Sequence, residues 1–391
     1  MEPSNERRRK GRVRMSNAQE EIIRTMLSGN DFALIGAGQL GDMAISLWPS
    51  FLPLPSVVLD SNKTGKCHGV NIAKLQGYRA DPRPVYLLSA FKLGTQEVPH
   101  IFADLGQDVV LTVYDFFEQY CPSMFSNGWR SLEPDESKLS LIASVRECFS
   151  DKRSLAAFDA AIDWRYRRVL TPGFECEPES TKYDLRRYAV ELGDYEAVFD
   201  CGAYDLSLAS YLNAASVRVK RYVAFEPDDT NFDRCLKALG KLAALGPETV
   251  VLEKKALFED ESERIFLESG LLSSRLVVEV PQELPGKPKT LRTITLDSYL
   301  DKFCPSAKGR TLLKLHIEGA ELPVLKGGEN FIRKTKPDIF VNLSHDEVSL
   351  LDIPLFLRGL GGYRMYLAGH SLFGEGITLF ATQFSGRDID E

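Results

Sequence analysis

Four ionisable residues gather where a short apolar segment ends, in the stretch TLLKLHIEGAELPVLKGG at 311–328. Lys314, His316 and Glu318 alternate with apolar residues as in a β-strand, and Glu321 follows one helical turn later. Burying ionisable groups is costly unless they are paired, so this cluster is more typical of a site than of packing. An imidazole can take a proton near neutral pH. We therefore predict His316 as a general base, with Lys314 and Glu318 as its catalytic partners.

Other interpretations of this segment stay open. His316 could be a structural histidine that hydrogen-bonds Glu318 or a backbone carbonyl, and Glu321 could be a plain acid at a helix N-terminus. His345 and His370 lie on later segments that could reach the same place, so both are catalytic candidates, although loop histidines are the simpler alternative. A metal site built from these histidines is conceivable, but no tight ligand spacing supports it. We assign no metal ligand from the sequence.

Two acids upstream are placed as in a site for S-adenosylmethionine. Asp200 ends the segment AVFD before a single-glycine turn, and Glu226 ends the next apolar segment, RYVAFE. S-adenosylmethionine has no phosphate to cradle, but it has a cationic amino-acid end and a ribose diol. The first acid can meet the amino group, and the second can accept both ribose hydroxyls. The following strand would bring Ala256 near the adenine. A helix cap for Asp200 and a solvated strand end for Glu226 are the structural alternatives.

The elements that would position these residues have the pattern of parallel α/β domains. Two segments, 31–48 and 197–212, run from an apolar strand through a glycine turn into a helix. Strands are predicted at 32–36, 56–60, 84–89, 109–113, 197–201, 220–225, 249–253, 291–296, 311–317, 337–343 and 374–381, the last near a sheet edge. We predict a basic disordered tail at 1–20, a smaller Rossmann-like domain at 21–121, a loop and helical connector at 122–190, and a doubly wound Rossmann-type domain at 191–391.

The first glycine turn, GAGQLG, has the spacing of a phosphate-binding loop. Gly36, Gly38 and Gly41 precede a helix, and Asp60 ends the next strand at about the distance expected for a ribose-binding carboxylate. These four residues are a candidate nucleotide, nucleotide-sugar or NAD site. The region is a half-Rossmann unit and looks like small N-terminal domains attached to sugar-modifying acyltransferases and to some methyltransferases. The alternative is a turn that only packs a helix on a sheet.

Six segments of the C-terminal half carry a family resemblance: FDCGAYD, AFEPDDTNF, TLDSYL, KLHIEGAELPVLKGG, KPDIFVNLSHDEVSLLDIP and GYRMYLAGHS. With these segments, the chain from about 145 to 382 resembles the FkbM-like family of S-adenosylmethionine-dependent methyltransferases. The resemblance implies a doubly wound methyltransferase domain that methylates a hydroxyl of a sugar, polysaccharide precursor or natural product. The cofactor residues that it implies are Asp200, Gly202, Ala203, Tyr204, Glu226 and, as a lesser candidate, Asn231.

Two residues depart from the family pattern. Leu206 stands where members usually have a glycine, and its side chain could crowd the methionine part of the cofactor. His316 stands where members usually have an aspartate. These departures motivate an alternative function, a methyltransferase fold that has lost catalysis and serves as a binding or assembly module. A third hypothesis is an NAD or nucleotide-sugar enzyme that uses the GAGQLG turn.

Composition narrows the class of protein further. The 391 residues carry a formal net charge of −7, which argues against nucleic-acid binding, and the one basic run lies at 7–14. No stretch approaches the roughly 18 apolar residues of a membrane span. The seven cysteines are scattered without a C-x-x-C pair, so we expect reduced thiols and a cytoplasmic protein. The expected partner is a small-molecule or glycan acceptor, and the sequence leaves homo-oligomer formation open.

Overall fold

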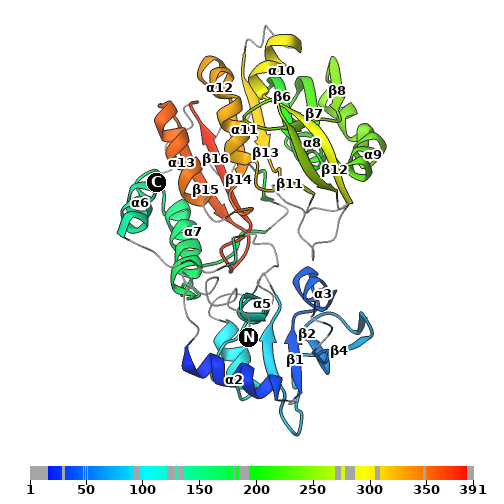
Figure 1. The fold of residues 1–391 in the computed structure, drawn as a ribbon, viewed down its shortest axis with the longest axis vertical. Helices are drawn as coiled ribbons and strands as arrows, with labels where there is room; N and C mark the ends of the chain where they lie inside the picture. The colour runs from blue at the N-terminus through cyan, green and yellow to red at the C-terminus, as the bar shows by residue number, and fades with distance from the viewer. Residues whose placement is uncertain are drawn as a thin grey trace.

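The chain forms two α/β units in the computed structural model, one above the other in Figure 1. The structure describes residues 16–28, 31–46, 48, 50, 52–90, 93, 97–120, 128–130, 132, 136–178, 181–184, 193–268, 274–277, 287–303, 309–346 and 349–384. The first fifteen residues of the predicted tail lie outside this part. The tail prediction is wrong for its last residues, because helix α2 begins at Asn17. Ser16 caps that helix in a reciprocal capping box with Gln19.

The N-terminal unit is built on a five-stranded sheet in the order β3-β4-β2-β1-β5. Strand β1 pairs in parallel with β2 and β5, β2 pairs in parallel with β4, and β3 pairs antiparallel with β4. The strands are β1 (Phe32–Ile35), β2 (Val57–Asp60), β3 (Gly65–Cys67), β4 (Val70–Lys74) and β5 (Val85–Leu88). The helices are α2 (Asn17–Leu27), α3 (Gln39–Ser46), α4 (Glu97–Asp104) and α5 (Val113–Tyr120). The β1, β2 and β5 predictions are confirmed to within one residue at each end.

The strand predicted at 109–113 is wrong, since α5 begins at Val113. Thr112 is the reason: its hydroxyl accepts a hydrogen bond from the Asp115 N–H, and the Asp115 carboxylate accepts one from the Thr112 N–H. This reciprocal cap starts a helix. Among the described residues of this segment, strand pairing is limited to one isolated parallel bridge between Leu88 and Thr112.

The C-terminal unit is built on a seven-stranded sheet in the order β15-β16-β14-β13-β6-β7-β8. Strand β16 pairs antiparallel with both of its neighbours, and every other pair is parallel. The strands are β6 (Tyr195–Cys201), β7 (Val219–Phe225), β8 (Thr249–Glu253), β13 (Thr311–Leu315), β14 (Asp338–Asn342), β15 (Arg364–Gly369) and β16 (Ile377–Thr382). The last strand lies second from the edge, because β15, which the sequence analysis missed, forms the edge itself.

The sheet is doubly wound, and the order in which the chain adds strands reverses between β6 and β13. From β6 the chain adds β7 and β8 on one side, and it then returns to add β13 and β14 on the other. Ligands of such sheets bind beyond the carboxyl ends of the strands at this reversal. The register pairs Lys314 with Asp200 and Leu315 with Cys201, so the two predicted sites meet at this point.

A small four-stranded sheet, in the order β11-β10-β12-β9, follows β8 in the chain, and the strand predicted at 291–296 corresponds to the end of its β12. Strand β10 pairs antiparallel with β11 and β12, and β12 pairs in parallel with β9. The strands are β9 (Ala256–Leu257), β10 (Glu263–Glu268), β11 (Arg275–Val277) and β12 (Lys287–Ile294). Most of their side chains are partly exposed, so they lack the apolar runs that marked the larger sheet.

Helices connect and cover the sheets. The predicted loop and helical connector at 122–190 contains α6 (Glu136–Arg146), α7 (Lys152–Ile162) and a π-helical turn η1 (Asp163–Arg167). The C-terminal unit adds α8 (Ser207–Ala214), α9 (Asp229–Ala238), the 3-10 helix η4 (Leu239–Leu245), α10 (Leu296–Phe303), α11 (Glu321–Gly327), α12 (Glu329–Thr335) and α13 (Ser349–Leu360).

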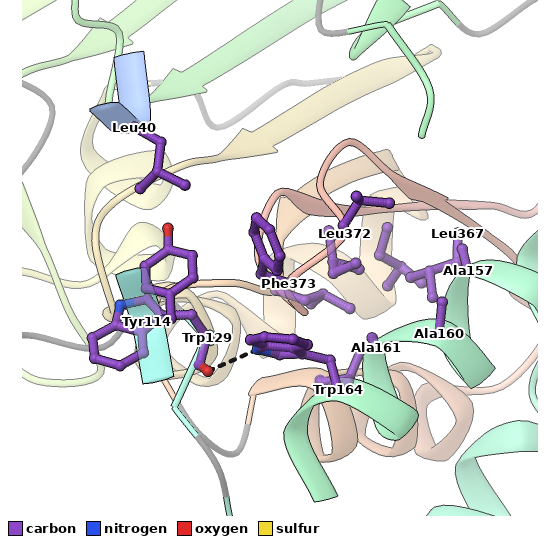
Figure 2. Close-up of a cluster of buried hydrophobic side chains, with 14 of the residues drawn as sticks. Leu40, Tyr114, Trp129, Ala157, Ala160, Ala161, Trp164, Leu367, Leu372 and Phe373 are labelled. Atoms are coloured by element: carbon purple, nitrogen blue, oxygen red, sulfur yellow. Dashed lines mark hydrogen bonds between the residues drawn. The ribbon is translucent and has the colours of Figure 1, made fainter. Parts of the chain in front are cut away.

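One hydrophobic cluster joins the two units across the connector. Figure 2 shows Tyr114 of α5, Trp164 of η1 and Phe373, from the loop after β15, packed together. The Tyr114 ring stacks on Trp129 at 4.8 Å and meets the edge of Phe373 at 5.3 Å. The Trp164 indole donates a hydrogen bond of 2.8 Å to the Trp129 carbonyl. The N-terminal unit therefore packs on the end of the seven-stranded sheet where β15 finishes.

Two further predictions concern the chain as a whole. None of the helices that the structure describes is long and apolar enough to cross a bilayer. Cys67, Cys148, Cys176, Cys201 and Cys235 are free thiols. Cys121 and Cys304 lie outside the described residues.

Candidate active site

Asp200 and Lys314 form a buried ion pair between β6 and β13. The Lys314 Nζ atom lies 2.8 Å from Asp200 Oδ1, and the Tyr222 hydroxyl donates a 2.6 Å hydrogen bond to Asp200 Oδ2. Burial alone would lower the pKa of Lys314, but the Asp200 carboxylate outweighs it and raises that pKa. Lys314 also donates to the Gly202 carbonyl. Each of the two charged groups is therefore neutralised by the other.

This pairing changes the roles predicted for both residues. Asp200 is fully buried with both carboxylate oxygens engaged, so the geometry favours a structural role over direct contact with a cofactor's amino group. Lys314 pairs with Asp200 and not with Glu318, so it is unsuited to stabilising an alkoxide. Together the two residues fix the strand ends from which the rest of the site extends.

The turn after β6 makes backbone contact with the end of β13. Gly202 has φ +79°, and a Cβ atom at this position would lie 2.0 Å from the His316 carbonyl oxygen. The His316 N–H donates to the Cys201 carbonyl at 3.0 Å. The Gly202 and Ala203 N–H groups both reach the Phe225 carbonyl, at 2.9 and 3.2 Å. Gly202 is required for this close approach, and the turn is tied to β7 and β13 together.

Leu206, one of the two departures from the family pattern, does not face an open crevice. It has φ +58°, in the left-handed region that glycine prefers, and its exposed fraction is 0%. Its side chain belongs to a hydrophobic cluster with residues such as Leu208 and Tyr222. The leucine therefore fills the core beneath the turn, and the crowding expected from the sequence is not supported.

Glu226 presents a buried carboxylate at the end of β7. It accepts hydrogen bonds from the Tyr204 N–H at 2.9 Å and the Asp228 N–H at 3.1 Å, one on each oxygen. Burial raises its pKa to about 7, against the lowering effect of those two backbone donors. A carboxylate has about four lone-pair sites, so each oxygen keeps one for a hydroxyl. Glu226 fits the diol-binding role that we predicted for it.

Two other predicted cofactor residues lie nearby in sequence but have contacts of their own. Asn231 is in the first turn of α9, where its N–H donates to Asp228 and its side-chain oxygen accepts from Arg234 at 2.8 Å. Ala256 pairs with Thr293 in the small sheet. Their use by a cofactor stays a prediction.

The turn after β13 is held by Glu321, which is completely buried. Its two carboxylate oxygens accept the Ile317 and Gly319 N–H groups, each at 2.9 Å. Glu318, between them, has φ +54°, and Gly319 has φ +102°. Glu321 is therefore more than an acid near a helix dipole: it fixes the turn that aims Glu318.

His345, which follows β14, lies between two carboxylates. Its Nδ1 is 2.5 Å from Glu321 Oε1, and its Nε2 is 3.2 Å from Glu318 Oε1. Burial would lower the pKa of His345, but Glu318 and Glu321 overcome this and raise it to about 10. In the protein as described, His345 is an imidazolium at neutral pH.

His316 stacks on His345, with ring centroids 4.9 Å apart. Its Nε2 lies 3.8 Å from Glu318 Oε1, and its Nδ1 lies 3.4 Å from Lys182 Nζ. Burial, followed by the cations Lys182 and His345, holds the pKa of His316 well below its usual range. His316 is therefore a neutral imidazole. We call His316, Glu318 and His345 the imidazole–carboxylate cluster.

The structure brings together three of the five predicted catalytic residues. Lys314 lies two positions before His316 in the chain but pairs with Asp200. His370 is buried after β15, where its Nδ1 is 3.1 Å from the Glu177 carbonyl oxygen, and the described contacts do not join it to the cluster. The sequence analysis missed Lys182 and Arg275, whose chain positions gave no signal, and undervalued Glu321, whose spacing from Glu318 could have revealed the turn.

The N-terminal glycine turn has packing reasons for two of its glycines. A Cβ atom on Gly36 would lie 2.8 Å from Ala90 Cβ, and one on Gly41 would lie 2.1 Å from the Gly36 carbonyl oxygen. Only Gly38 of the three has open space around that position. Asp60 accepts the N–H groups of Ala37, Asn62 and Lys63, each at 2.8 Å. Its carboxylate thus holds the loop itself, and a nucleotide site here stays a prediction.

Comparison with known proteins agrees with a doubly wound methyltransferase-type domain. A crystal structure of methyltransferase FkbM from Methylobacillus flagellatus KT has a similar fold over 94% of this chain and 94% of its own, with a TM-score of 0.62 and 17% identity. An rRNA methylase from Streptococcus thermophilus has 12% identity, covers 50% of this chain and 92% of its own, and has a TM-score of 0.30, too low to support an argument. No curated protein matches the chain significantly.

A second comparison concerns the C-terminal unit alone. Residues 200–365 match the family model of the methyltransferase FkbM domain. Over these residues the match confirms the resemblance inferred from the sequence.

Proposed function

We propose that this protein transfers a methyl group from S-adenosylmethionine to a hydroxyl of a sugar or a related hydroxylated metabolite. The observation that carries the proposal is the backbone contact between Gly202 and His316 at the reversal point of the sheet. It joins the turn suited to the cofactor directly to the imidazole–carboxylate cluster. The methyl donor and the acceptor must lie next to each other, because their alignment supplies much of the rate acceleration of methyl transfer.

The residues of the turn fit S-adenosylmethionine on one point of chemistry. The Glu226 carboxylate is buried, and each of its oxygens has one backbone donor and room for a hydroxyl, as a ribose diol requires. When bound, the cofactor would supply an electrophilic methyl group on a sulfonium. Asp200 and Lys314 would keep the turn in place without contacting the cofactor.

The imidazole–carboxylate cluster supports an oxygen acceptor. Its nitrogen and carboxylate atoms can accept a hydrogen bond from a hydroxyl, and removing that proton adds roughly 10²–10⁴-fold to the rate of such reactions. His316 is the most exposed member, with 22% of its side chain accessible, against 10% for Glu318 and 4% for His345. An acceptor hydroxyl would thus approach the cluster from the His316 side.

Titration calorimetry of the full chain with S-adenosylmethionine and S-adenosylhomocysteine tests the cofactor assignment. We expect binding that Glu226→Gln weakens at least tenfold, because the amide replaces one acceptor with a donor. The matched control is Glu263→Gln, an exposed acid on β10, which should bind like the parent. No binding at millimolar ligand to folded protein would sink the proposal.

The acceptor is tested separately with labelled S-adenosylmethionine. Free sugars, nucleotide sugars and small phenols would be compared for methyl incorporation, with product analysis to locate the new ether. We expect an O-methylated sugar or related hydroxylated metabolite. Transfer only to nitrogen, or only to the phenols, contradicts the proposed acceptor class while leaving the cofactor assignment intact.

A further inference from the structure

The imidazole–carboxylate cluster has the arrangement of a metal-binding site. We propose that His316 Nε2, Glu318 Oε1 and His345 Nε2 bind one divalent transition-metal ion. The three side chains each offer an atom within 4.8 Å of the other two. The separation from Glu318 Oε1 is 3.2 Å to His345 Nε2 and 3.8 Å to His316 Nε2. Ligands about 2.0–2.1 Å from a tetrahedral ion lie about 3.3 Å apart, so only small shifts are needed.

His345 is oriented as metal-binding histidines are. Its Nδ1 faces Glu321, which is itself fixed by the Ile317 and Gly319 N–H groups. A carboxylate on the far nitrogen sets the ring orientation and leaves Nε2 to the ion.

Glu318 is held from behind in the same way. Arg275 Nη2 lies 3.3 Å from Glu318 Oε2, so the other oxygen, Oε1, is the one turned toward both imidazoles. The left-handed backbone of Glu318 supports this aim, because such a conformation is costly for a non-glycine residue and persists where its surroundings require it.

His316 is the third proposed metal ligand, and the positive charge of the nearby Lys182 disfavours metal binding there. The Lys182 ammonium lies 3.4 Å from Nδ1, which is longer than a good hydrogen bond, and the flexible side chain can withdraw. The Nε2 atom, on the other side of the ring, faces Glu318. A nearby ammonium weakens cation binding, so removing Lys182 should tighten it.

The donor atoms define the kind of metal. Two imidazoles and one carboxylate suit Zn²⁺, Fe²⁺ or Mn²⁺ better than Mg²⁺ or Ca²⁺, which prefer oxygen ligands. Three protein ligands leave at least one coordination position open. This position would take the acceptor hydroxyl, and the ion would lower the pKa of that hydroxyl in place of direct proton acceptance by the ligand atoms. This step rests on the proposed function; metal binding itself does not.

The experiment uses the full chain after treatment with a chelator. Zn²⁺ and Mn²⁺ are titrated by calorimetry, and Co²⁺ is added to record visible absorption from a four- or five-coordinate ion. We expect one ion per chain with micromolar or tighter affinity for Zn²⁺. His316→Ala and His345→Ala should each weaken it at least 30-fold and abolish the Co²⁺ absorption.

A second cluster supplies the control. Asp42, Cys67 and His68 in the N-terminal unit also lie within metal-ligand reach of one another, and His68 is exposed. His68→Ala should leave the affinity and the Co²⁺ spectrum of the proposed site unchanged. If His68→Ala removes the bound ion while His316→Ala does not, the proposal is overturned.

Two further variants keep the proposal falsifiable if His345→Ala fails to fold. His316→Asp should shift preference from Zn²⁺ toward Mn²⁺, and Lys182→Ala should tighten Zn²⁺ several-fold. Unchanged affinity and preference in both would contradict the site. Binding of S-adenosylmethionine is measured on the same samples, so loss of cofactor binding with the metal retained counts against the proposed function alone.

Discussion

At the scale of single residues, the most consequential feature is that charges which look catalytic in the sequence are divided between two jobs. Lys314 lies in β13 and His316 lies one residue beyond its end, yet the first neutralises Asp200 in the core and the second belongs to the imidazole–carboxylate cluster. Both residues could be placed at a strand end from the sequence. Their different roles could not be predicted, because the partner of Lys314 comes from β6, more than a hundred residues earlier in the chain.

The buried pair gives a prediction about stability. Lys314→Met should lower the free energy of unfolding by about 3–5 kcal/mol at pH 7, because it leaves the Asp200 carboxylate buried and unpaired. Denaturant unfolding measures the change. Asp200→Asn in the same chain should recover part of the loss, and Lys220→Met, which removes an exposed pair with Glu196, should cost at most about 1 kcal/mol. An equal cost for both lysines would contradict the argument.

Glu226 gives a prediction about pH. With a pKa near 7, its carboxylate gains a proton as pH falls and then loses acceptor capacity for a ribose diol. Affinity for S-adenosylhomocysteine should therefore rise as pH increases from 6 to 8, by up to about tenfold per unit below the pKa. Calorimetry at each pH gives the profile. Glu226→Gln should bind weakly with a flat profile, and a parental slope retained in that variant would assign the titration to another group.

At the scale of elements, the parallel strands of the seven-stranded sheet could be predicted from their apolar runs. Short strands and strands with exposed polar side chains could not. Strands β6, β7, β8, β13 and β14 lie where the sequence placed them, because all but β8 are largely buried and therefore apolar. The hairpin of β3 and β4 and the strands β10 and β11 are short or half-exposed, so they show no such run, and only the last residues of β12 were predicted, within 291–296. The Thr112 cap shows the opposite error, in which a helix start was taken for a strand.

Leu206 supplies a prediction at this scale, since it is the first residue before α8. Leu206→Gly relieves a left-handed leucine, worth about 1–2 kcal/mol. It also deletes a fully buried side chain, which costs about 2–5 kcal/mol for leucine to alanine. We expect a net loss of about 2 kcal/mol in denaturant unfolding and unchanged cofactor affinity in the folded protein. Tighter binding in the variant would instead support crowding of the cofactor by Leu206.

At the scale of the whole molecule, the two α/β units share one core, and a buried acid lies at their junction. The Tyr114 hydroxyl hydrogen-bonds Glu375 Oε1 at 2.5 Å, linking α5 to the loop after β15. Arg165, also fully buried, donates to the Gly374 carbonyl at 2.7 Å. Sequence analysis predicted two units from two glycine turns. It could not predict their junction, which depends on side chains from three separate segments.

The junction should make stability depend on pH. Burial raises the pKa of Glu375 to about 8, so between pH 4.5 and 8 the folded chain holds a proton that the unfolded chain has released. This group's contribution therefore falls as pH rises, by up to about 1.4 kcal/mol per unit. Melting temperatures at pH 6 and 8.5 should differ less in Glu375→Gln than in the parent. An identical difference in both proteins would exclude Glu375 as the source.

The loop that follows β15 has a consequence for any attempt to isolate the methyltransferase domain. Phe373 has an exposed fraction of 0%, and its ring packs against Tyr114 of α5 and Trp164 of η1. A chain shortened to 191–391 would lack both aromatic partners of Phe373 and would expose this side chain at the carboxyl edge of its sheet. We therefore expect the shortened chain to aggregate more than the full chain, which light scattering of the two proteins at equal concentration would measure.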